Sequence, residues 1–198
     1  MAIFEYRCVK VHSCEDIYEP SEDTFLLMDS VSGVRDKKCL EVGTGSGMVA
    51  CLLAKSGNVV TATDIEKDAV SCARKNAKLN GVAVKFKQAD MFEGIKGKFD
   101  VILFNPPYLP TEEEDRVKGP LNKALDGGAD GLAVTRQFLR TAPQFLAPDG
   151  EIFVIISSLS PPDAIERVLS GFEHEVVGRC KHFFEEIRCY RLNTWEGT

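Results

Sequence analysis

The sequence predicts an α/β protein of the doubly wound class, with a seven-stranded, mostly parallel sheet that ends in an antiparallel strand pair. From about residue 20 onward, strand-like and helix-like stretches alternate with short connections, as they do in a parallel sheet covered on both faces. The apolar run at 99–104 is typical of a buried parallel strand. A glycine loop follows the strand predicted at 39–42, and sheets of this class bind ligands at the carboxyl ends of their strands.

The individual elements follow from local signals. Ser21 precedes Glu22 and Asp23, so a capping serine and two first-turn acids predict a helix from residue 21 to about residue 31. Further helices are predicted at 48–55, 66–79, 134–146 and 161–169. Strands are predicted at 39–42, 59–63, 82–86, 99–104 and 151–156, with a closing antiparallel pair at 174–183 and 187–192. Because the stretch 109–130 is polar and rich in Gly, Asp and Glu, we predict a substrate-side loop there.

Length and composition indicate a single domain. With 198 residues the chain is too short for two ordinary domains, so we predict one domain over 1–198 with a short N-terminal extension at 1–17. No apolar run approaches the roughly 20 residues of a membrane helix, and the first residues lack a secretory signal pattern. A formal charge of −6 disfavours nucleic acid as a partner. We expect an intracellular protein, either cytoplasmic or both cytoplasmic and nuclear.

Cysteines and histidines give no sign of a metal site. The seven cysteines are odd in number and no two have Cys-x-x-Cys spacing, whereas a disulfide framework or a zinc site would need closer, paired spacing. The three histidines also lack metal-ligand spacing. We therefore expect buried free thiols in a reducing compartment and no bound metal.

The loop after the first strand has the sequence Glu41-Val42-Gly43-Thr44-Gly45-Ser46-Gly47. Its glycines allow a tight strand-to-helix turn and a close approach of the backbone to a ligand. A dinucleotide fingerprint would need a glycine where Met48 stands, and the lysine of a phosphate-binding P-loop is also missing. Glu41 would repel a diphosphate, but it tolerates a cationic ligand.

Two further acids end the next two strands. Asp64 follows the loop by about twenty residues, where an acid commonly binds ribose hydroxyls, and Asp90 ends the third strand. With Glu41, three carboxylates converge on one crevice. S-adenosylmethionine fits this crevice, because it carries ribose hydroxyls, an adenine amine, an ammonium and a sulfonium but no phosphate. We predict this cofactor; a nicotinamide dinucleotide is the main alternative, and Met48 counts against it.

The fourth strand leads directly into Asn105-Pro106-Pro107-Tyr108. The two prolines restrict the backbone and remove two N–H donors, so the Asn105 side-chain oxygen and the Pro106 carbonyl remain as acceptors. Such a pair suits a planar NH₂ group, which donates two hydrogens, and Tyr108 can pack on a planar substrate. We predict a methyltransferase that acts on an amide or amino nitrogen, with catalysis mostly by positioning and electrostatics.

Three alternatives stay open. The exocyclic amine of adenine presents the same planar NH₂ group, but the negative charge and the absence of a target-recognition domain in so short a chain count against adenine N6 methylation. A protein lysine is a weaker alternative, since a tetrahedral amine needs no planar clamp. An inactive scaffold subunit would need neither the glycine loop nor Asn-Pro-Pro-Tyr.

The glycine loop, Asp64 and Asn105-Pro106-Pro107-Tyr108 together resemble the Rossmann-like class I S-adenosylmethionine-dependent methyltransferases of the HemK type. The segment 18–27, Tyr-Glu-Pro-Ser-Glu-Asp-Thr-Phe-Leu-Leu, resembles the short eukaryotic and archaeal branch, which lacks the extra N-terminal helical domain of the bacterial enzymes. The similarity covers roughly residues 15–192. It implies methylation of the glutamine side-chain nitrogen in the Gly-Gly-Gln loop of the eukaryotic peptide-chain release factor.

The resemblance also implies roles for individual residues. Cofactor contacts are implied for residues of the strand ends and the first helix: Thr24, Glu41, Gly43, Gly45, Asp64, Asp90, Met91 and Asn105. Asn105 would also bind the glutamine amide, with Pro106, Pro107 and Tyr108 completing the grip. Residues 124–131 resemble the family's glycine segment on the substrate side, although Leu125-Asp126 stands where the family often has Trp-Ala.

Members of this branch work with a small zinc-binding activator protein, so the resemblance implies a heterodimer. In the predicted fold the strand 82–86 lies at a sheet edge, and an exposed edge can accept a partner strand. We expect the activator to cover this edge.

Overall fold

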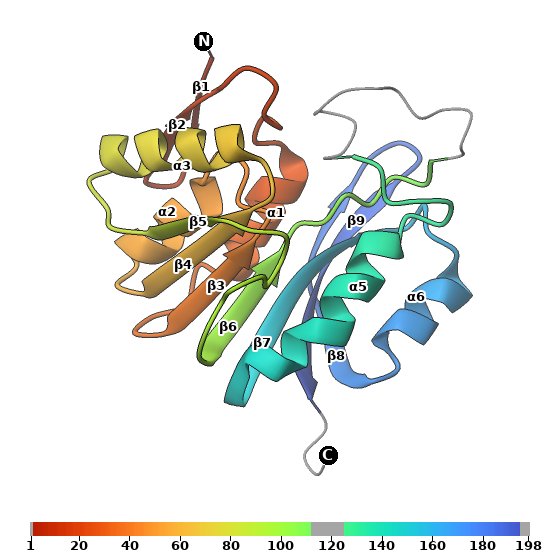
Figure 1. Cartoon of the computed structure of the whole chain (residues 1–198). Helices are drawn as coiled ribbons and strands as arrows, with labels where there is room; N and C mark the ends of the chain where they lie inside the picture. The colour runs from red at the N-terminus through yellow and green to blue at the C-terminus, as the bar shows by residue number, and fades with distance from the viewer. Residues whose placement is uncertain (1, 112–124, 195–198) are drawn as a thin grey trace.

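The computed structural model describes residues 2–111 and 125–194 and contains the predicted sheet (Figure 1). Seven strands lie in the order β5-β4-β3-β6-β7-β9-β8, with β5 to β7 parallel and β9 antiparallel to both β7 and β8. The strands are β3 (Lys38–Val42), β4 (Val59–Asp64), β5 (Lys85–Gln88), β6 (Phe99–Phe104), β7 (Leu146–Ser157), β8 (Phe172–Lys181) and β9 (Glu186–Thr194). The predicted fold class is therefore confirmed.

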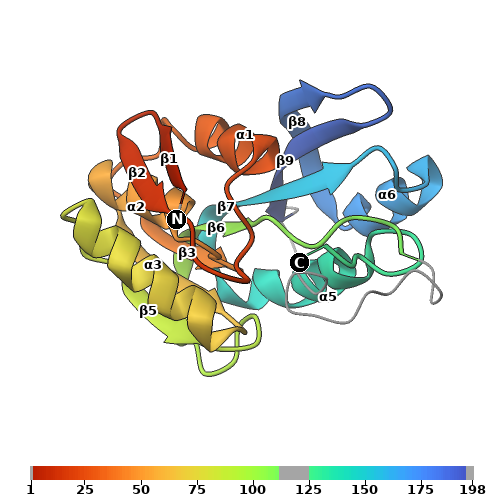
Figure 2. The same cartoon turned by 90° about the horizontal axis from the view of Figure 1, so that it is seen from above.

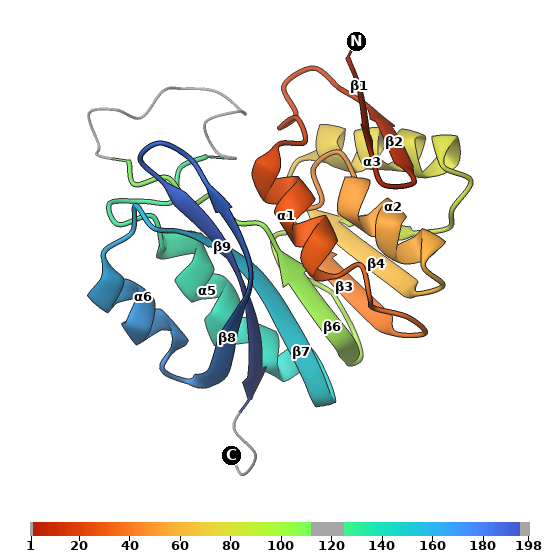
Figure 3. The ribbon, with the colours of Figure 1, turned by 180° about the vertical axis from the view of Figure 1, so that it is seen from behind.

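Helices cover both faces of the sheet. One face carries α1 (Glu22–Ser30), α2 (Met48–Lys55) and α3 (Lys67–Leu79), and the other carries α5 (Ala133–Thr141), the 3₁₀ turn η2 (Ala142–Phe145) and α6 (Pro162–Leu169). Figure 1 shows α5 and α6 in front of the sheet, and Figure 3 shows α1 and α2 in front of it from behind.

The inner strands are apolar throughout because both of their faces are buried. On β6, Val101 and Leu103 belong to the core under α1 and α2, whereas Ile102 and Phe104 belong to the core under α5 and α6. Successive side chains of a strand point to opposite faces, so a strand with helices on both faces has no solvent-facing position. This burial places the end of β6, and the motif that follows it, at a fixed position.

A hairpin of β1 (Ile3–Tyr6) and β2 (Val9–His12) occupies the stretch predicted only as an extension. Its Val9 and Val11 side chains are fully buried. Asn76 of α3 accepts a hydrogen bond from the His12 N–H at 2.9 Å, and Asn80 both accepts from and donates to the Lys10 backbone. The hairpin lies against α2 and α3 (Figure 2), and it leads the chain to the rim of the sheet.

The expectation that every cysteine is free is wrong. Cys14, just after the hairpin, forms a disulfide with Cys72 of α3 across 58 residues of sequence. The fold brings these positions together because β2 lies along α3, and no local spacing in the sequence indicates that contact. The thiols of Cys8, Cys39, Cys51, Cys180 and Cys189 are free, so cysteine usage no longer indicates a reducing compartment.

Several element boundaries differ from the prediction; the helix predicted at 134–146, for example, ends as α5 at Thr141 and continues as η2. The edge strand β5 spans Lys85–Gln88 rather than 82–86, because the Val82 N–H donates to the Ala77 carbonyl at 3.1 Å and so closes α3. Strand β7 already begins at Leu146, and the predicted turn at 148–150 lies within a register shift of this strand. Ser21 does precede α1, but its hydroxyl donates to the Glu22 carboxylate instead of capping the helix.

Candidate active site

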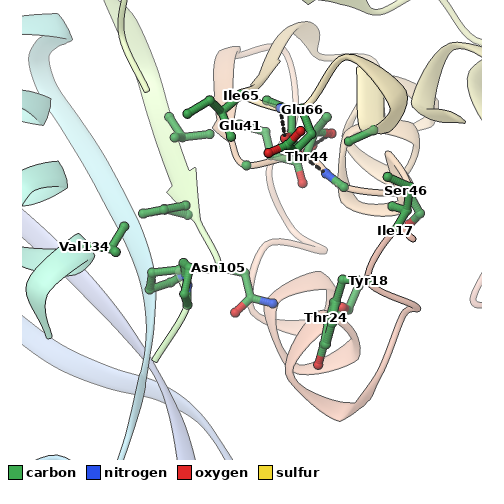
Figure 4. A pocket seen from close by; sticks show the side chains of 18 of the residues that line it. Ile17, Tyr18, Thr24, Glu41, Thr44, Ser46, Ile65, Glu66, Asn105 and Val134 are labelled. Carbon is green, nitrogen blue, oxygen red and sulfur yellow. Dashed lines mark hydrogen bonds between the residues drawn. The ribbon is translucent and has the colours of Figure 1, made fainter. Parts of the chain in front are cut away.

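A cavity of about 350 Å³ opens at the carboxyl ends of β3, β4 and β6. Every residue predicted for the site lines it: Thr24, Glu41, Gly43, Gly45, Asp64, Asp90, Met91, Asn105, Pro106, Pro107 and Tyr108. Figure 4 shows Glu41 and Thr44 on one side of this space, with Asn105 and Thr24 on another. The fold thus brings all the predicted side chains to one place.

The glycine loop lies at the floor of the cavity and depends on its glycines. Gly43 and Gly47 have positive φ values of 64° and 79°, a region that favours glycine. A Cβ atom on Gly43 would lie 2.9 Å from the Phe104 ring, and one on Gly47 would lie 2.8 Å from the Cβ of Ala73. The Thr44 N–H donates to the Thr63 carbonyl at 2.9 Å, so the loop is fixed to the end of β4.

Glu41 is a buried acid at the end of β3. Its side chain is only 4% exposed, and the Thr44 hydroxyl donates to its Oε2 at 2.6 Å. Burial raises the pKa of Glu41 to about 8, since a carboxylate is poorly solvated there, and the Thr44 hydrogen bond offsets part of this effect. No cation neutralises the carboxylate by a contact within the described residues, which suits the ammonium group of a ligand.

Asp64 is held by the backbone on two sides. Its Oδ2 accepts from the Gly45 N–H at 2.9 Å and its Oδ1 accepts from the Glu66 N–H at 3.0 Å. Burial raises the pKa of Asp64, and these two backbone hydrogen bonds oppose the shift. Each oxygen keeps a free lone pair, so the carboxylate can accept hydroxyl protons from a ribose.

Asp90 and Met91 form the wall beyond β5. Met91 has a positive φ of 45°, and its carbonyl accepts from the Thr63 hydroxyl at 3.0 Å. The Asp90 carbonyl accepts from the Glu93 N–H at 2.9 Å and closes a turn. The third predicted carboxylate therefore reaches the same cavity as Glu41 and Asp64.

Asn105 lines the cavity and has an unsatisfied buried acceptor. Its Oδ1 atom is buried, and no hydrogen-bond donor reaches it from residues 2–111 or 125–194. Figure 4 shows the Asn105 side chain at the end of β6, with its nitrogen on the side that faces Thr24. An unpaired buried polar atom costs about 1–3 kcal/mol, so this position is suited to a ligand that donates a hydrogen bond.

Tyr108 is fixed by a residue whose role the sequence did not reveal. The Tyr108 and Tyr18 hydroxyls both donate to Oδ2 of Asp23 at 3.1 Å. Asp23 is 2% exposed, and its Oδ1 accepts from the Thr24 N–H at 2.6 Å. Burial and the Asp23 carboxylate both raise the pKa values of the two tyrosines, which stay protonated donors. From the sequence, Asp23 is an ordinary first-turn acid, and no local pattern indicates that it binds two tyrosine hydroxyls.

The glycine segment packs against the chain that follows Tyr108. The Leu109 N–H donates to the Leu125 carbonyl at 3.1 Å, and the Gly127 N–H donates to the Leu109 carbonyl at 2.9 Å. A Cβ atom on Gly127 would lie 2.7 Å from the backbone of Gly131, which explains the small residues here. The rest of the predicted loop, 112–124, lies outside the described residues.

Comparison with known proteins identifies the family. The description "Methyltransferase small domain" matches residues 19–183. The chain belongs to this methyltransferase family. It is 39% identical over 196 residues to "Putative protein N5-glutamine methyltransferase MJ0928" of Methanocaldococcus jannaschii, covering 98% of each chain. It is 34% identical over 166 residues to "Methyltransferase HEMK2" of Mus musculus, covering 78% of each chain.

A solved structure supports the same family assignment. The chain superimposes on the E. cuniculi Mtq2-Trm112 complex, described as responsible for methylation of the eRF1 translation termination factor, with a TM-score of 0.71 and 25% identity. The match covers 91% of this chain and 99% of the other. The two chains therefore share their fold over nearly their whole lengths.

S-adenosylmethionine is the cofactor of this methyltransferase, and the residues of the cavity fit it. Bound there, it supplies a methyl group on a positively charged sulfur. The buried Glu41 carboxylate suits its ammonium group, Asp64 suits its ribose hydroxyls, and the glycine loop lets the backbone approach closely. No helix among the described residues is long and apolar enough to span a bilayer.

Proposed function

We propose that this methyltransferase transfers the methyl group of S-adenosylmethionine to the N5 nitrogen of a glutamine side chain, in the Gly-Gly-Gln loop of a eukaryotic-type peptide-chain release factor. The observation that carries the proposal is the buried Oδ1 atom of Asn105, a residue that lines the cofactor cavity and whose Oδ1 lacks a donor within the described part of the chain. The names of MJ0928 and of the Mtq2-Trm112 complex point to the same chemistry.

A carboxamide nitrogen matches the acceptors at this position. Its two hydrogens lie in one plane, and Asn105 Oδ1 and the Pro106 carbonyl can each accept one of them. Neither proline has an N–H that would compete as a donor. Two fixed acceptors orient the nitrogen toward the cofactor's methyl group, and such positioning accounts for much of catalysis in a group transfer of this kind.

The remaining site residues divide between cofactor and support. We assign cofactor contacts to Thr24, Glu41, Gly43, Gly45, Asp64, Asp90, Met91 and Asn105, all of which line the cavity. Pro106, Pro107 and Tyr108 complete the substrate grip. Tyr108 is a positioning residue in this scheme, because its hydroxyl is held by Asp23 and the ring forms a wall beside Asn105.

A small zinc-binding activator subunit completes the enzyme in this proposal. The Mtq2 relative forms a complex with Trm112. The strand β5 ends the sheet, and two exposed apolar side chains lie on β4 and α3, the elements next to it: Val59 at 71% and Leu79 at 50% exposure. An uncovered edge flanked by apolar side chains suits strand addition by a partner.

The test is methyl transfer from labelled S-adenosylmethionine to purified release factor, with the chain co-expressed with its activator. The matched control is a release factor whose loop glutamine is replaced. Label that disappears with the glutamine would establish the substrate. Label that persists in the control, or that enters adenine in DNA or RNA or a protein lysine instead, would overturn it. Since release factors act on ribosomes, we expect this reaction to take place in the cytoplasm.

A further inference from the structure

The turn between β8 and β9 exposes two adjacent phenylalanines. Phe183 is 101% and Phe184 is 93% exposed, more than any other large apolar side chain of the described residues. Their ring centroids lie 6.4 Å apart, so they form one apolar tip. Burying an exposed aromatic pair against a partner removes apolar surface from water, and aromatic side chains dominate the energetics of protein interfaces.

The tip is held in place by the end of β7. The Ser157 hydroxyl donates to Glu185 Oε1 at 2.6 Å, and the Glu186 N–H donates to the Ser158 hydroxyl at 2.8 Å. The turn itself is closed by the His182 N–H, which donates to the Glu185 carbonyl at 2.7 Å. Because these bonds fix the turn, the two rings are presented outward by a supported scaffold, which lowers the entropic cost of docking.

The tip stands beside the mouth of the active site. Figures 1 and 3 both show the turn between β8 and β9 at the end of the sheet where β6 leads into the active-site motif. The electrostatic contacts agree, since Glu185 contributes to the raised pKa of Tyr108 and His182 interacts with Glu22 at the start of α1. A macromolecule whose side chain enters the cavity past Tyr108 would therefore have this tip close by.

We propose that Phe183 and Phe184 form a docking anchor for the protein substrate. This inference rests on the proposed function, because it needs a folded protein that delivers a glutamine to Asn105. The activator is a less suitable occupant, since β5, where we place it, and the β8–β9 pair lie at opposite edges of the sheet. The anchor would bind the body of the release factor while the loop enters the cavity.

The experiment compares a folded and a minimal substrate. The activator-bound enzyme is assayed with intact release factor and with a short peptide that contains Gly-Gly-Gln, using the double variant Phe183→Ser/Phe184→Ser. We expect the KM for release factor to rise by about tenfold or more, the scale of a lost aromatic anchor, with kcat and the activity on the peptide unchanged. The matched control is Val177→Ser, a 37% exposed residue of β8 away from the tip.

Each other outcome contradicts the anchor in a recognisable way. An unchanged KM for release factor, with a wild-type enzyme that methylates it, would overturn the anchor and leave the proposed function intact. Loss of the activator from the purified double variant would assign the tip to that subunit instead. A wild-type enzyme that does not label the loop glutamine would remove the proposed function and the anchor together. Unchanged affinity for S-adenosylmethionine is expected, since neither phenylalanine lines the cavity.

Discussion

At the residue scale, Asn105 lowers the stability of the empty protein and provides an acceptor for a ligand. Its buried Oδ1 has no donor in the described part of the chain, and an unpaired buried acceptor costs about 1–3 kcal/mol. Such local violations of packing rules are expected at functional sites. A ligand that donates to Oδ1 would recover this free energy in the bound state.

We predict that Asn105→Ala lowers kcat/KM for release factor by about 10²–10³-fold, the loss typical of one positioned polar group. The melting temperature should stay the same or rise, because the unpaired acceptor is gone. Asn105→Asp keeps an oxygen acceptor and should retain more activity than the alanine variant. Steady-state kinetics and thermal unfolding check this pair, and an alanine variant with nearly full activity would rule out the clamp.

Glu41 makes the affinity for the cofactor depend on pH. Burial raises the pKa of its carboxyl from the usual 4.5 to about 8. Below pH 8 the carboxyl is mostly protonated, and a cationic ammonium binds the ionised form. We predict that the Kd for S-adenosylmethionine falls as the pH rises from 6 to 8, approaching tenfold per pH unit well below the pKa. Titration calorimetry should find a weaker Kd and a shallower pH dependence for Glu41→Gln.

The raised pKa of Glu41 also makes the free energy of unfolding depend on pH. The folded protein binds the Glu41 proton more tightly than the unfolded chain does, so the free energy of unfolding falls as the pH rises from about 4.5 to about 8. Glu41→Gln should lose this part of the pH dependence. Urea unfolding at several pH values measures it, and an identical slope in both proteins would contradict a raised pKa.

At the scale of elements, the parallel sheet was predictable and the N-terminal segment was not. Buried strands such as 99–104 and amphipathic helices such as 66–79 carry their periodicity in local sequence, and β6 and α3 match these ranges within a residue. The hairpin β1–β2 has only four residues per strand, and buried Val9 and Val11 together with hydrogen bonds to Asn76 and Asn80 hold it. The two hydrogen bonds join positions more than sixty residues apart, so the local sequence does not indicate them.

The candidate site also contains residues that the local sequence predicts and contacts that it does not. Residues attached to strand ends, such as Glu41, Asp64 and Asn105, were predictable because parallel strands deliver their carboxyl ends to one edge. The Tyr18–Asp23–Tyr108 contacts join a pre-helical segment to the motif after β6 across 85 residues. Pairings of this range are set by packing, and a single sequence contains no periodicity that records them.

The disulfide is the element-scale feature with the largest expected energetic effect. Cys14 and Cys72 pack with Ile17 and Ala69, and Ile17 and Ala69 also line the cavity. Closing a loop of 58 residues contributes about 4 kcal/mol in the chain-entropy treatment. We predict that Cys14→Ser lowers the free energy of unfolding by about 2–4 kcal/mol and weakens cofactor binding.

Urea unfolding with and without reductant checks this prediction. Reductant should move the wild-type transition toward that of Cys14→Ser, and it should leave the variant itself unchanged. Cys8→Ser, which alters an exposed free thiol, is the matched control and should behave like the wild type. A wild-type transition that does not respond to reductant would show that the pair does not stabilise the fold.

At the scale of the whole molecule, the two edges of the sheet have different partners in our proposals. The activator would cover β5, and the protein substrate would contact the tip beyond β8 and β9, at the other edge. The cavity opens between these edges, at the ends of β3, β4 and β6. A heterodimer built in this way leaves the active-site mouth open to a large substrate.

Hydrogen exchange can test in one experiment which partner binds at which edge of the sheet. We predict that binding of the activator slows exchange of the β5 amides by about tenfold or more, because a partner strand pairs with an edge that otherwise opens easily. The amides of β8 serve as the internal control and should keep their rates. Adding release factor to the heterodimer should then slow exchange in the turn around Phe183 and leave β5 unchanged. Activator-induced protection at β8 instead of β5 would reverse the assignment of the two edges and remove the physical basis for an open active-site mouth.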